Sequence, residues 1–468
     1  MPEARDSFQL GDTIVLPGET RHMRLAVSES YVSTQIEIPL TIINGIAEGP
    51  IVFVCAASHG DECNGTGIAR ELIYGVDHSN LRGVLVVAPV LNLPGFLRNE
   101  RDLPDGRDLN RNFPGKPDGN SAQRIANAIF KKMVQKCDYG IDLHTATRGR
   151  SNILQVRGDM TNTEVRRIAR AFGSEIVIDE PGLAGTLRRA ATETGIPTIT
   201  AEIGESQRFE KELVKSGLSG VLNVLYELGM LKGKTVPPIF QVIVKKTEWV
   251  RANKGGILEM IAEPRGLVSE GEELCTITNP FGKEVGTVRA PFTGMVVGIT
   301  NYPMVSPGSP ICHLVKLDRT LSTVESALRK EKEAKERPKT ARAEGQPGEP
   351  SARGPGALSE PAAAAGLSAT APQGPAPVMV SPPVIISPPA TGLLEEQGDV
   401  DDRPLKPDKE PKKERKSKKE PVQKELVVVE ARKDEPAEGA PNGEPDGDAR
   451  PSAYYEDYDE DAEPEEKE

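Results

Sequence analysis

Short apolar runs alternate with segments of helical spacing along the first half of the chain. Residues 51–57 and 83–90 contain almost no polar side chain, as expected of strands that are covered on both faces of a largely parallel sheet. Between them, residues 65–74 place their apolar side chains near helical spacing. The order strand, helix, strand predicts an α/β domain with a right-handed crossover.

The same alternation continues on both sides of this unit. Upstream, residues 13–16, 23–27 and 36–43 read as strands, which we expect at the edge of the sheet. Downstream we predict strands over 139–143, 153–156, 175–178 and 198–203, a helix capped by Ser121, and helices over 163–172, 187–194 and 213–231. Residues 92–119 break all periodicity with prolines and glycines and predict a long irregular loop, which in a compact domain is usually functional.

Beyond residue 236 the pattern changes to short β-rich runs. They predict a small β-rich domain over residues 237–320, followed by a charged helix over 321–337. Residues 290–297 are similar to the half-repeat of biotinyl/lipoyl-like barrels, which indicates a barrel-like domain that covers the mouth of a site or supports oligomerisation. Residues 338–468 are rich in Pro and poor in apolar side chains, so we predict a disordered tail.

The net negative charge of the sequence lies in its C-terminal part. Residues 331–468 contain 20 Lys and Arg against 32 Asp and Glu, and this difference equals the net charge of −12 of the whole sequence. The preceding residues are balanced, so we expect no nucleic-acid partner for the folded part. The tail is a candidate binding segment for a partner that the sequence does not identify, although a solvated linker has the same composition.

The cysteines and the N-terminal residues indicate the cellular compartment in which the protein is expected. The five cysteines are scattered and form no CxxC pair, which argues against a disulfide framework and a thiolate zinc knuckle. The N-terminus lacks the apolar core of a signal peptide, and no run approaches the roughly 18 apolar residues that a membrane span needs. We therefore predict a soluble, cytoplasmic protein without membrane association.

Two of the five histidines stand where predicted core strands end. His59 follows the strand 51–57 with Glu62 three residues later, and His144 follows the strand 139–143. The carboxyl ends of strands in an open α/β sheet are where ligands collect. Two imidazoles and one carboxylate would complete a catalytic zinc site with one open position. A single histidine in a core is more often an ordinary hydrogen-bonded residue, but two at strand ends beside a carboxylate favour the metal site.

The predicted loop gathers arginines. Arg98, Arg101 and Arg107 precede the run Asp108-Leu109-Asn110-Arg111-Asn112. A guanidinium fork suits a carboxylate, and it also suits the oxyanion that forms when water attacks a carbonyl. An ordinary solvated basic loop would have the same composition.

One further carboxylate follows an apolar strand at Glu202. A glutamate beside a metal site can accept the proton of water and pass it to a leaving amine. A surface glutamate at a strand end is the equally simple interpretation.

Four motifs in order resemble those of the succinylglutamate desuccinylase/aspartoacylase family, which has the zinc carboxypeptidase-like fold. They are His59-Gly60-Asp61-Glu62, the run from Asp108 to Gly115, Ile141-Asp142-Leu143-His144-Thr145 and Glu202-Ile203-Gly204-Glu205. The resemblance spans about residues 30–320 and does not cover the tail. It implies that residues 1–236 form a zinc-dependent deacylase domain, a three-layer α/β/α domain with a mixed sheet.

The resemblance also implies roles for individual residues. His59, Glu62 and His144 would bind one zinc ion per subunit, and Glu202 would be the general base and acid. Asn110 and Arg111 would bind the substrate carboxylate. Arg101 would polarise the carbonyl, with Arg107 as the alternative for that role or as a further substrate-binding residue. Asp142 could orient a ligand histidine or be a buried structural residue.

The resulting hypothesis is a zinc-dependent amidohydrolase that removes an acetyl, succinyl or similar acyl group from an N-acylated amino acid or a related amine. A zinc carboxypeptidase acting on short peptides is the first alternative, because the same residues serve both reactions. A non-catalytic scaffold that works through its acidic tail is the second. A homo-oligomer fits all three, and the identity of the acyl group lies in pocket side chains that motif order does not place.

Overall fold

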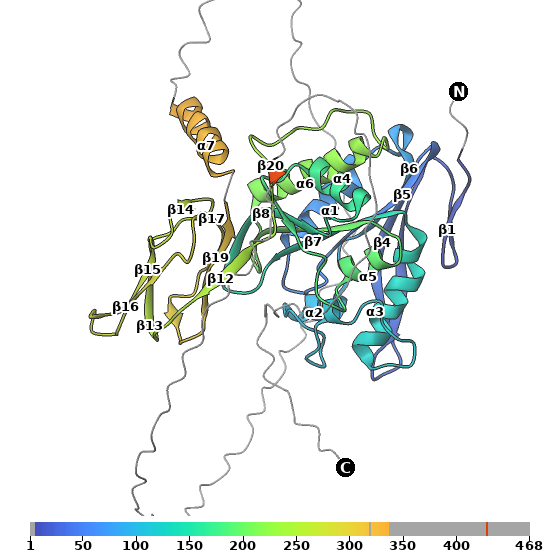
Figure 1. Ribbon diagram of the computed structural model, residues 1–468. Coiled ribbons are helices and arrows are strands. Elements are labelled where there is room, and N and C mark those ends of the chain that lie inside the picture. The colour runs from blue at the N-terminus through green and yellow to red at the C-terminus, as the bar shows by residue number, and fades with distance from the viewer. Residues whose placement is uncertain (1–4, 318–319, 337–426, 429–468) are drawn as a thin grey trace, which may run out of the picture. The chain divides into compact units, whose positions relative to one another are not determined.

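One mixed β-sheet organises the computed structural model, which describes residues 5–317, 320–336 and 427–428 (Figure 1). Its main path, in spatial order, is β3 (Glu19–Glu29), β4 (Gln35–Asn44), β6 (Arg82–Ala88), β5 (Ala47–Ala56), β7 (Tyr139–Ala146), β10 (Thr198–Glu205), β8 (Arg150–Gly158), β17 (Gly294–Thr300), β19 (Pro310–Lys316) and β12 (Thr247–Arg251). β5, β6, β7 and β10 are parallel, whereas β3, β4 and β8 pair antiparallel with their neighbours on this path. The predicted mixed sheet, with N-terminal strands at one edge, is confirmed.

Helices cover both faces of the central strands (Figure 1). One face carries α1 (Asn64–Gly75), α4 (Thr163–Phe172) and α6 (Lys211–Glu227), and the other carries α2 (Leu93–Arg98), α3 (Ser121–Lys132) and α5 (Leu187–Glu193). Successive residues of β5 enter the two cores in turn: Val52 and Val54 pack with α1 and α6, and Phe53 and Cys55 pack with α3 and α5. The run is apolar throughout because neither face meets water. The three layers are those predicted.

Two local predictions in and after the long loop are wrong. Residues 92–119 contain the short helix α2, because the side chain of Asn92 accepts from the N–H of Gly95 and Pro94 is tolerated in the first turn. The cap of α3 is Asn120 rather than Ser121. Asn120 and Gln123 form a reciprocal capping box, in which each side chain pairs with the other's backbone N–H.

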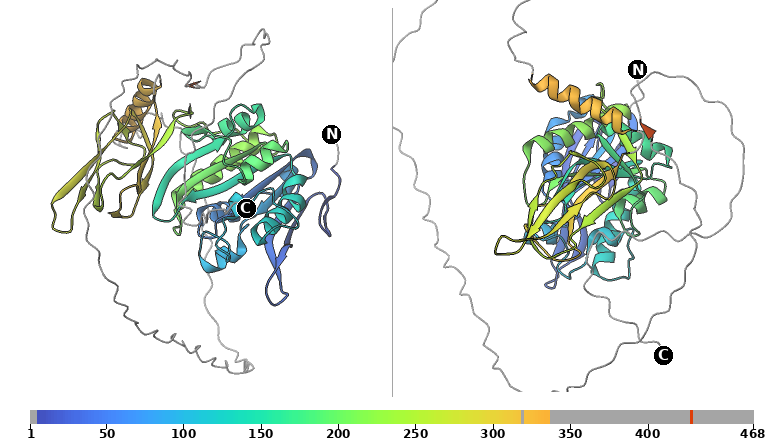
Figure 2. Two further views of the ribbon diagram at one scale, coloured as in Figure 1. Left: turned by 60° about the horizontal axis from the view of Figure 1, so that its bottom comes forward. Right: turned by 60° about the vertical axis from the view of Figure 1, so that its left-hand side comes forward.

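The β-rich segment joins the main sheet through strand pairing. β17 lies antiparallel to β8, so strands after residue 247 continue the sheet beyond β8 (Figure 2). A separate sheet has the order β16 (Glu284–Arg289), β15 (Glu273–Thr278), β13 (Gly256–Met260) and β18 (Met304–Val305). The boundary at residue 237 stays a prediction.

Smaller elements complete the described chain. They are the hairpin β1 (Phe8–Leu10) and β2 (Thr13–Val15), the side strands β9 (Ile176–Asp179), β11 (Val242–Val244), β14 (Leu267–Val268) and β20 (Val427–Val428), the 3-10 turns η1 (His78–Asn80), η2 (Leu109–Arg111) and η3 (Val134–Lys136), and α7 (Leu321–Glu336). Apart from the short strand β20, which pairs with β11, the tail predicted to be disordered lies outside the described residues.

All five cysteines are free thiols. Burial raises the pKa of Cys275 to about 11 and that of Cys312 to about 12, so both thiols are protonated at neutral pH. Across the ranges that the structure describes, no helix is both long and apolar enough to cross a membrane. The cytoplasmic location stays a prediction.

Close packing at Gly140 predicts a measurable loss of stability on substitution. A Cβ at Gly140 in β7 would come within 2.1 Å of the Phe53 ring in the neighbouring strand. We expect Gly140→Ala to lower the free energy of unfolding by about 1–3 kcal/mol, because an overpacked core must shift. Gly75→Ala is the control, since no atom lies within 4 Å of a Cβ there. Thermal unfolding of both variants measures the effect, and equal melting temperatures would contradict it.

Candidate active site

Close backbone packing shapes the turn that follows β5. A Cβ at Gly60 would come within 2.1 Å of the carbonyl carbon of Gly95 in α2. The N–H of Gly60 donates to the carbonyl oxygen of Arg101 at 3.1 Å. The turn is therefore pressed against the loop that carries the candidate arginines, and it presents His59 and Glu62 at the carboxyl end of β5.

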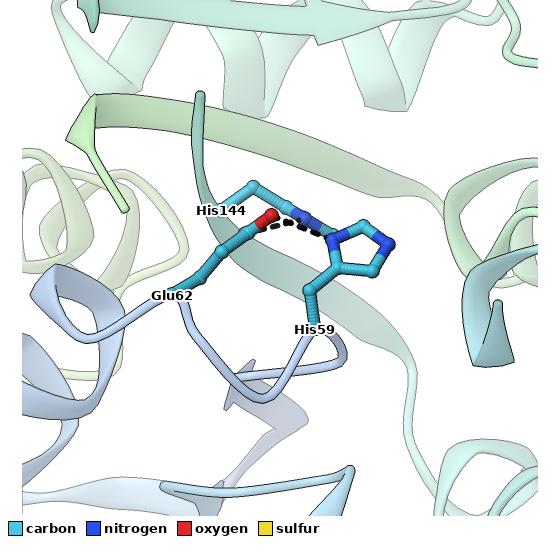
Figure 3. A group of neighbouring side chains, drawn as sticks. All are labelled: His59, Glu62 and His144. Atoms are coloured by element: carbon cyan, nitrogen blue, oxygen red, sulfur yellow. Dashed lines mark hydrogen bonds and ion pairs between the residues drawn. The ribbon is translucent and has the colours of Figure 1, made fainter. Parts of the chain in front are cut away.

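Three side chains converge at this end of the sheet (Figure 3). Glu62 lies between two imidazoles: Oε1 is 2.6 Å from Nδ1 of His59, and Oε2 is 3.0 Å from Nδ1 of His144. The three potential ligand atoms all lie within 4.8 Å of one another, and all three residues are buried. The parallel pairing of β5 with β7 explains the convergence, because it brings the carboxyl ends of both strands together.

The outer nitrogen of each imidazole faces another carboxylate. Nε2 of His59 lies 3.0 Å from Asp108 Oδ1, and Nε2 of His144 lies 2.9 Å from Asp142 Oδ2. An ionised carboxylate only accepts hydrogen bonds, so both Nε2 atoms carry a proton. In the neutral form of each ring, the Nδ1 lone pair then faces Glu62, as it would in a metal ligand. A proton on each Nδ1, or one metal ion among the three side chains, accounts for such short distances. Two imidazole nitrogens and a carboxylate, oriented by outer carboxylates, fit a catalytic zinc site.

The electrostatics of the cluster also favour a positive charge at its centre. Burial by itself lowers the pKa of His144, but the carboxylates of Asp142 and Glu62 outweigh it and hold that pKa well above its ordinary value. Burial raises the pKa of Glu62, yet the two imidazoles hold it far below its ordinary value. Burial likewise raises the pKa of Asp108, and the nearby cationic groups hold it well below its usual range.

The two candidate arginines for the carbonyl lie in different surroundings. Arg101 Nη1 is 3.6 Å from Glu62 Oε1, and its Nη2 donates to Asp108 Oδ2 at 3.0 Å. Arg107 pairs with Asp105 at 3.2 Å, and half of its side chain is exposed. The structure therefore brings Arg101 to the three clustered residues, whereas the contacts described for Arg107 stay within its own loop.

Asn110 and Arg111 approach different residues at the site. Asn110 Nδ2 is 3.3 Å from His144 Nε2, and its Oδ1 accepts from the backbone N–H of Leu187 at the start of α5. Arg111 Nη1 lies 3.7 Å from Asp108 Oδ2. The backbone N–H of Asn110 also donates to Asp108 Oδ1 at 2.7 Å, so Asp108 links both residues to His59.

Glu202 stands beside His144 in the sheet. The two residues are register partners in the parallel pair β10 and β7, so their side chains leave the sheet on one face. Its Oε2 accepts from Nδ2 of Asn152 at 3.3 Å, and its Oε1 lies 3.8 Å from Nε of Arg157. A carboxylate is thus placed next to the three clustered residues without belonging to them.

The sequence motifs did not predict two sets of contacts at this site: the contact of Asp108 with His59, and the contacts of Asn152 and Arg157 with Glu202. Asp108 is the first residue of the motif that contains Asn110. The sequence therefore singled out Asp108, but it did not predict that this carboxylate contacts His59. Asn152 and Arg157 reach Glu202 only because β8 turns back antiparallel to β10. No local pattern in residues 150–158 distinguishes them from an ordinary half-buried strand.

Part of the chain is similar to a known family of enzymes. Residues 48–228 match the model of the succinylglutamate desuccinylase/aspartoacylase catalytic domain. A curated relative from Halomonas elongata is named N-alpha-acetyl-L-2,4-diaminobutyric acid deacetylase. It is 25% identical over 304 residues, which cover 61% of this chain and 87% of the relative.

Solved structures share the fold. The product-bound ectoine utilization protein EutE from Ruegeria pomeroyi is 22% identical with a TM-score of 0.58, and the match covers 68% of this chain and 98% of that one. The succinylglutamate desuccinylase/aspartoacylase from Rhodobacter sphaeroides is 23% identical with a TM-score of 0.58, over 67% of this chain and 96% of that one. At these identities the likeness shows the fold alone.

Proposed function

Because this chain belongs to the succinylglutamate desuccinylase/aspartoacylase family, we propose that it hydrolyses the amide bond of an N-acylated amino acid or a related amine with the help of zinc. The observation that carries the proposal is the convergence of His59, Glu62 and His144 beside the carboxylate of Glu202. The name of the Halomonas relative makes an N-acetylated amino acid the first substrate to test.

His59 Nδ1, Glu62 and His144 Nδ1 would hold the metal, and Asp108 and Asp142 would keep both imidazoles in the ligating orientation. When bound in such a site, zinc acts as a Lewis acid toward water and toward a carbonyl oxygen. With both imidazoles deprotonated at Nδ1, two neutral rings and one carboxylate would hold the ion and leave the site with a net positive charge.

Glu202 would supply the proton transfers. Its carboxylate accepts a proton from the attacking water and then delivers that proton to the amine as the amide bond breaks, which balances the hydrolysis. The Arg101 guanidinium, next to Glu62, would stabilise the negative charge that develops on the carbonyl oxygen. Asn110 and Arg111 would bind the carboxylate of the substrate through an amide and a guanidinium donor, and Arg107 is a more peripheral substrate-binding candidate.

A substrate screen on the purified full chain tests this proposal. N-acetyl and N-succinyl amino acids and short peptides are supplied in parallel, and zinc is quantified in the same preparation. We expect about one zinc per chain and release of the free acyl acid. Release of C-terminal residues from peptides without deacylation would favour a carboxypeptidase. Absence of both hydrolysis and stoichiometric zinc would favour a non-catalytic scaffold.

A further inference from the structure

Asn152 connects Glu202 to the β-rich segment. Asn152 is buried, with only 6% of the residue exposed. One end of its amide, Nδ2, donates to Glu202 Oε2 at 3.3 Å. Its backbone is the register partner of Gly298 in β17. One short side chain on β8 thus lies between the carboxylate proposed as the base and a strand that begins 92 residues after Glu202.

Gly298 provides the room for the other end of this amide. A Cβ at Gly298 would come within 2.6 Å of Asn152 Oδ1, whereas the next nearest atoms, in His313 and Ser151, lie at 3.4 Å. Gly298 is not among the glycines with a left-handed φ, so its backbone would accept alanine without strain. The side chain of Asn152 is therefore what makes a methyl group tight at this position.

Packing on the far side holds β17 in place. Gly298 pairs with His313 in β19, and the His313 ring stacks on Trp249 of β12 at 4.9 Å between centroids with an interplanar angle of 7°. The guanidinium of Arg150, at the start of β8, lies 4.9 Å above the Trp249 ring. These contacts join β8, β12 and β19 around β17, and they oppose a displacement of the strand that carries Gly298.

We propose that Asn152 is a positioning residue for Glu202 and that the β-rich segment, through Gly298, is part of the hydrolytic site. The inference rests on the proposed function, in which Glu202 is the base. A neutral amide orients the carboxylate without adding charge. Arg157, whose Nε lies 3.8 Å from Glu202 Oε1, adds a positive charge and also pairs with Glu180 at 3.6 Å. A covering or oligomerising role alone would not require this contact.

Three substitutions in the full chain test the proposal. Asn152→Ala removes the donor, and Gly298→Ala displaces the amide from the opposite side. Gly255→Ala in the same segment is the matched control, because the nearest atoms to a Cβ there lie at 3.5 Å. We expect a kcat about 10- to 100-fold lower in the first two, as for the loss of a hydrogen bond to a charged group. KM, zinc content and melting temperature should change little, and Gly255→Ala should equal wild type.

The double variant Asn152→Ala/Gly298→Ala separates this role from general destabilisation. If Gly298 acts through the Asn152 amide, the double variant should be no slower than Asn152→Ala alone, because the second change has nothing left to displace. Losses of kcat that multiply, or a kcat of Asn152→Ala within twofold of wild type, would overturn the proposal.

Crystal structures of wild type and Gly298→Ala provide a readout that does not depend on activity. We expect the contact between Asn152 Nδ2 and the Glu202 carboxylate in wild type and its loss in the variant. An unchanged contact would overturn the inference even if no substrate is found. Absence of deacylation by wild type with this contact intact would instead contradict the proposed function alone.

Discussion

Replacing Glu202 with glutamine should lower the kcat for deacylation by about 100- to 10,000-fold, the usual range for loss of a general acid–base group. The amide keeps the size of the side chain and its place beside His144 but cannot accept the proton of water. Zinc content and melting temperature should stay at wild-type values, because Glu202 is not one of the three clustered residues. Turnover of an N-acetyl amino acid, measured with zinc content on the same sample, checks this result.

Glu205 offers a matched control for that variant. It lies on the same strand, β10, and its carboxylate is 3.5 Å from Arg208 rather than next to the cluster. Glu205→Gln should therefore keep kcat within a few-fold of wild type, as expected for a pair near the surface. A Glu202→Gln enzyme that retains kcat within tenfold of wild type would contradict the role of base, whatever the control shows.

Removing the metal should abolish activity and lower the melting temperature together. Lewis-acid stabilisation is worth several kcal/mol, so we expect deacylation to fall more than about 1,000-fold in the chelated protein. The melting temperature should fall as well, because a ligand that binds only the folded state stabilises it by mass action. Restored zinc should recover both quantities. Full activity after exhaustive chelation, with no metal detected in the sample, would contradict the prediction.

Substitution of one ligand distinguishes this site from adventitious metal. His144→Ala should lose stoichiometric zinc and should not recover activity when zinc is added, since Glu62 and His59 alone leave the site one ligand short. His78→Ala is the control, because His78 lies in η1 and its ring contacts Thr20 at 3.5 Å rather than the cluster. Equal zinc content in the two variants would remove His144 from the ligand set.

The proximity of the residues at the strand ends could be predicted from the sequence. His59, Glu62 and His144 were predictable as neighbours because apolar runs mark buried parallel strands, and the carboxyl ends of such strands meet at one edge. The choice between Arg101 and Arg107 was not predictable in this way. The two lie six residues apart in one loop. In the structure Gly60 packs against α2, and Arg101 in the following loop reaches Glu62.

The sequence by itself predicted the mixed α/β fold, the resemblance to the family and the candidate ligands and base, because buried strands and motif spacing are properties of consecutive residues. Only the tertiary structure decided that Asp108 orients His59, that Asn152 reaches Glu202, and that Gly298 in the β-rich segment leaves room for Asn152. These contacts join residues 49, 50 and 146 positions apart. They depend on which strands pair and in what register, and periodicity along one strand carries no information about its partner.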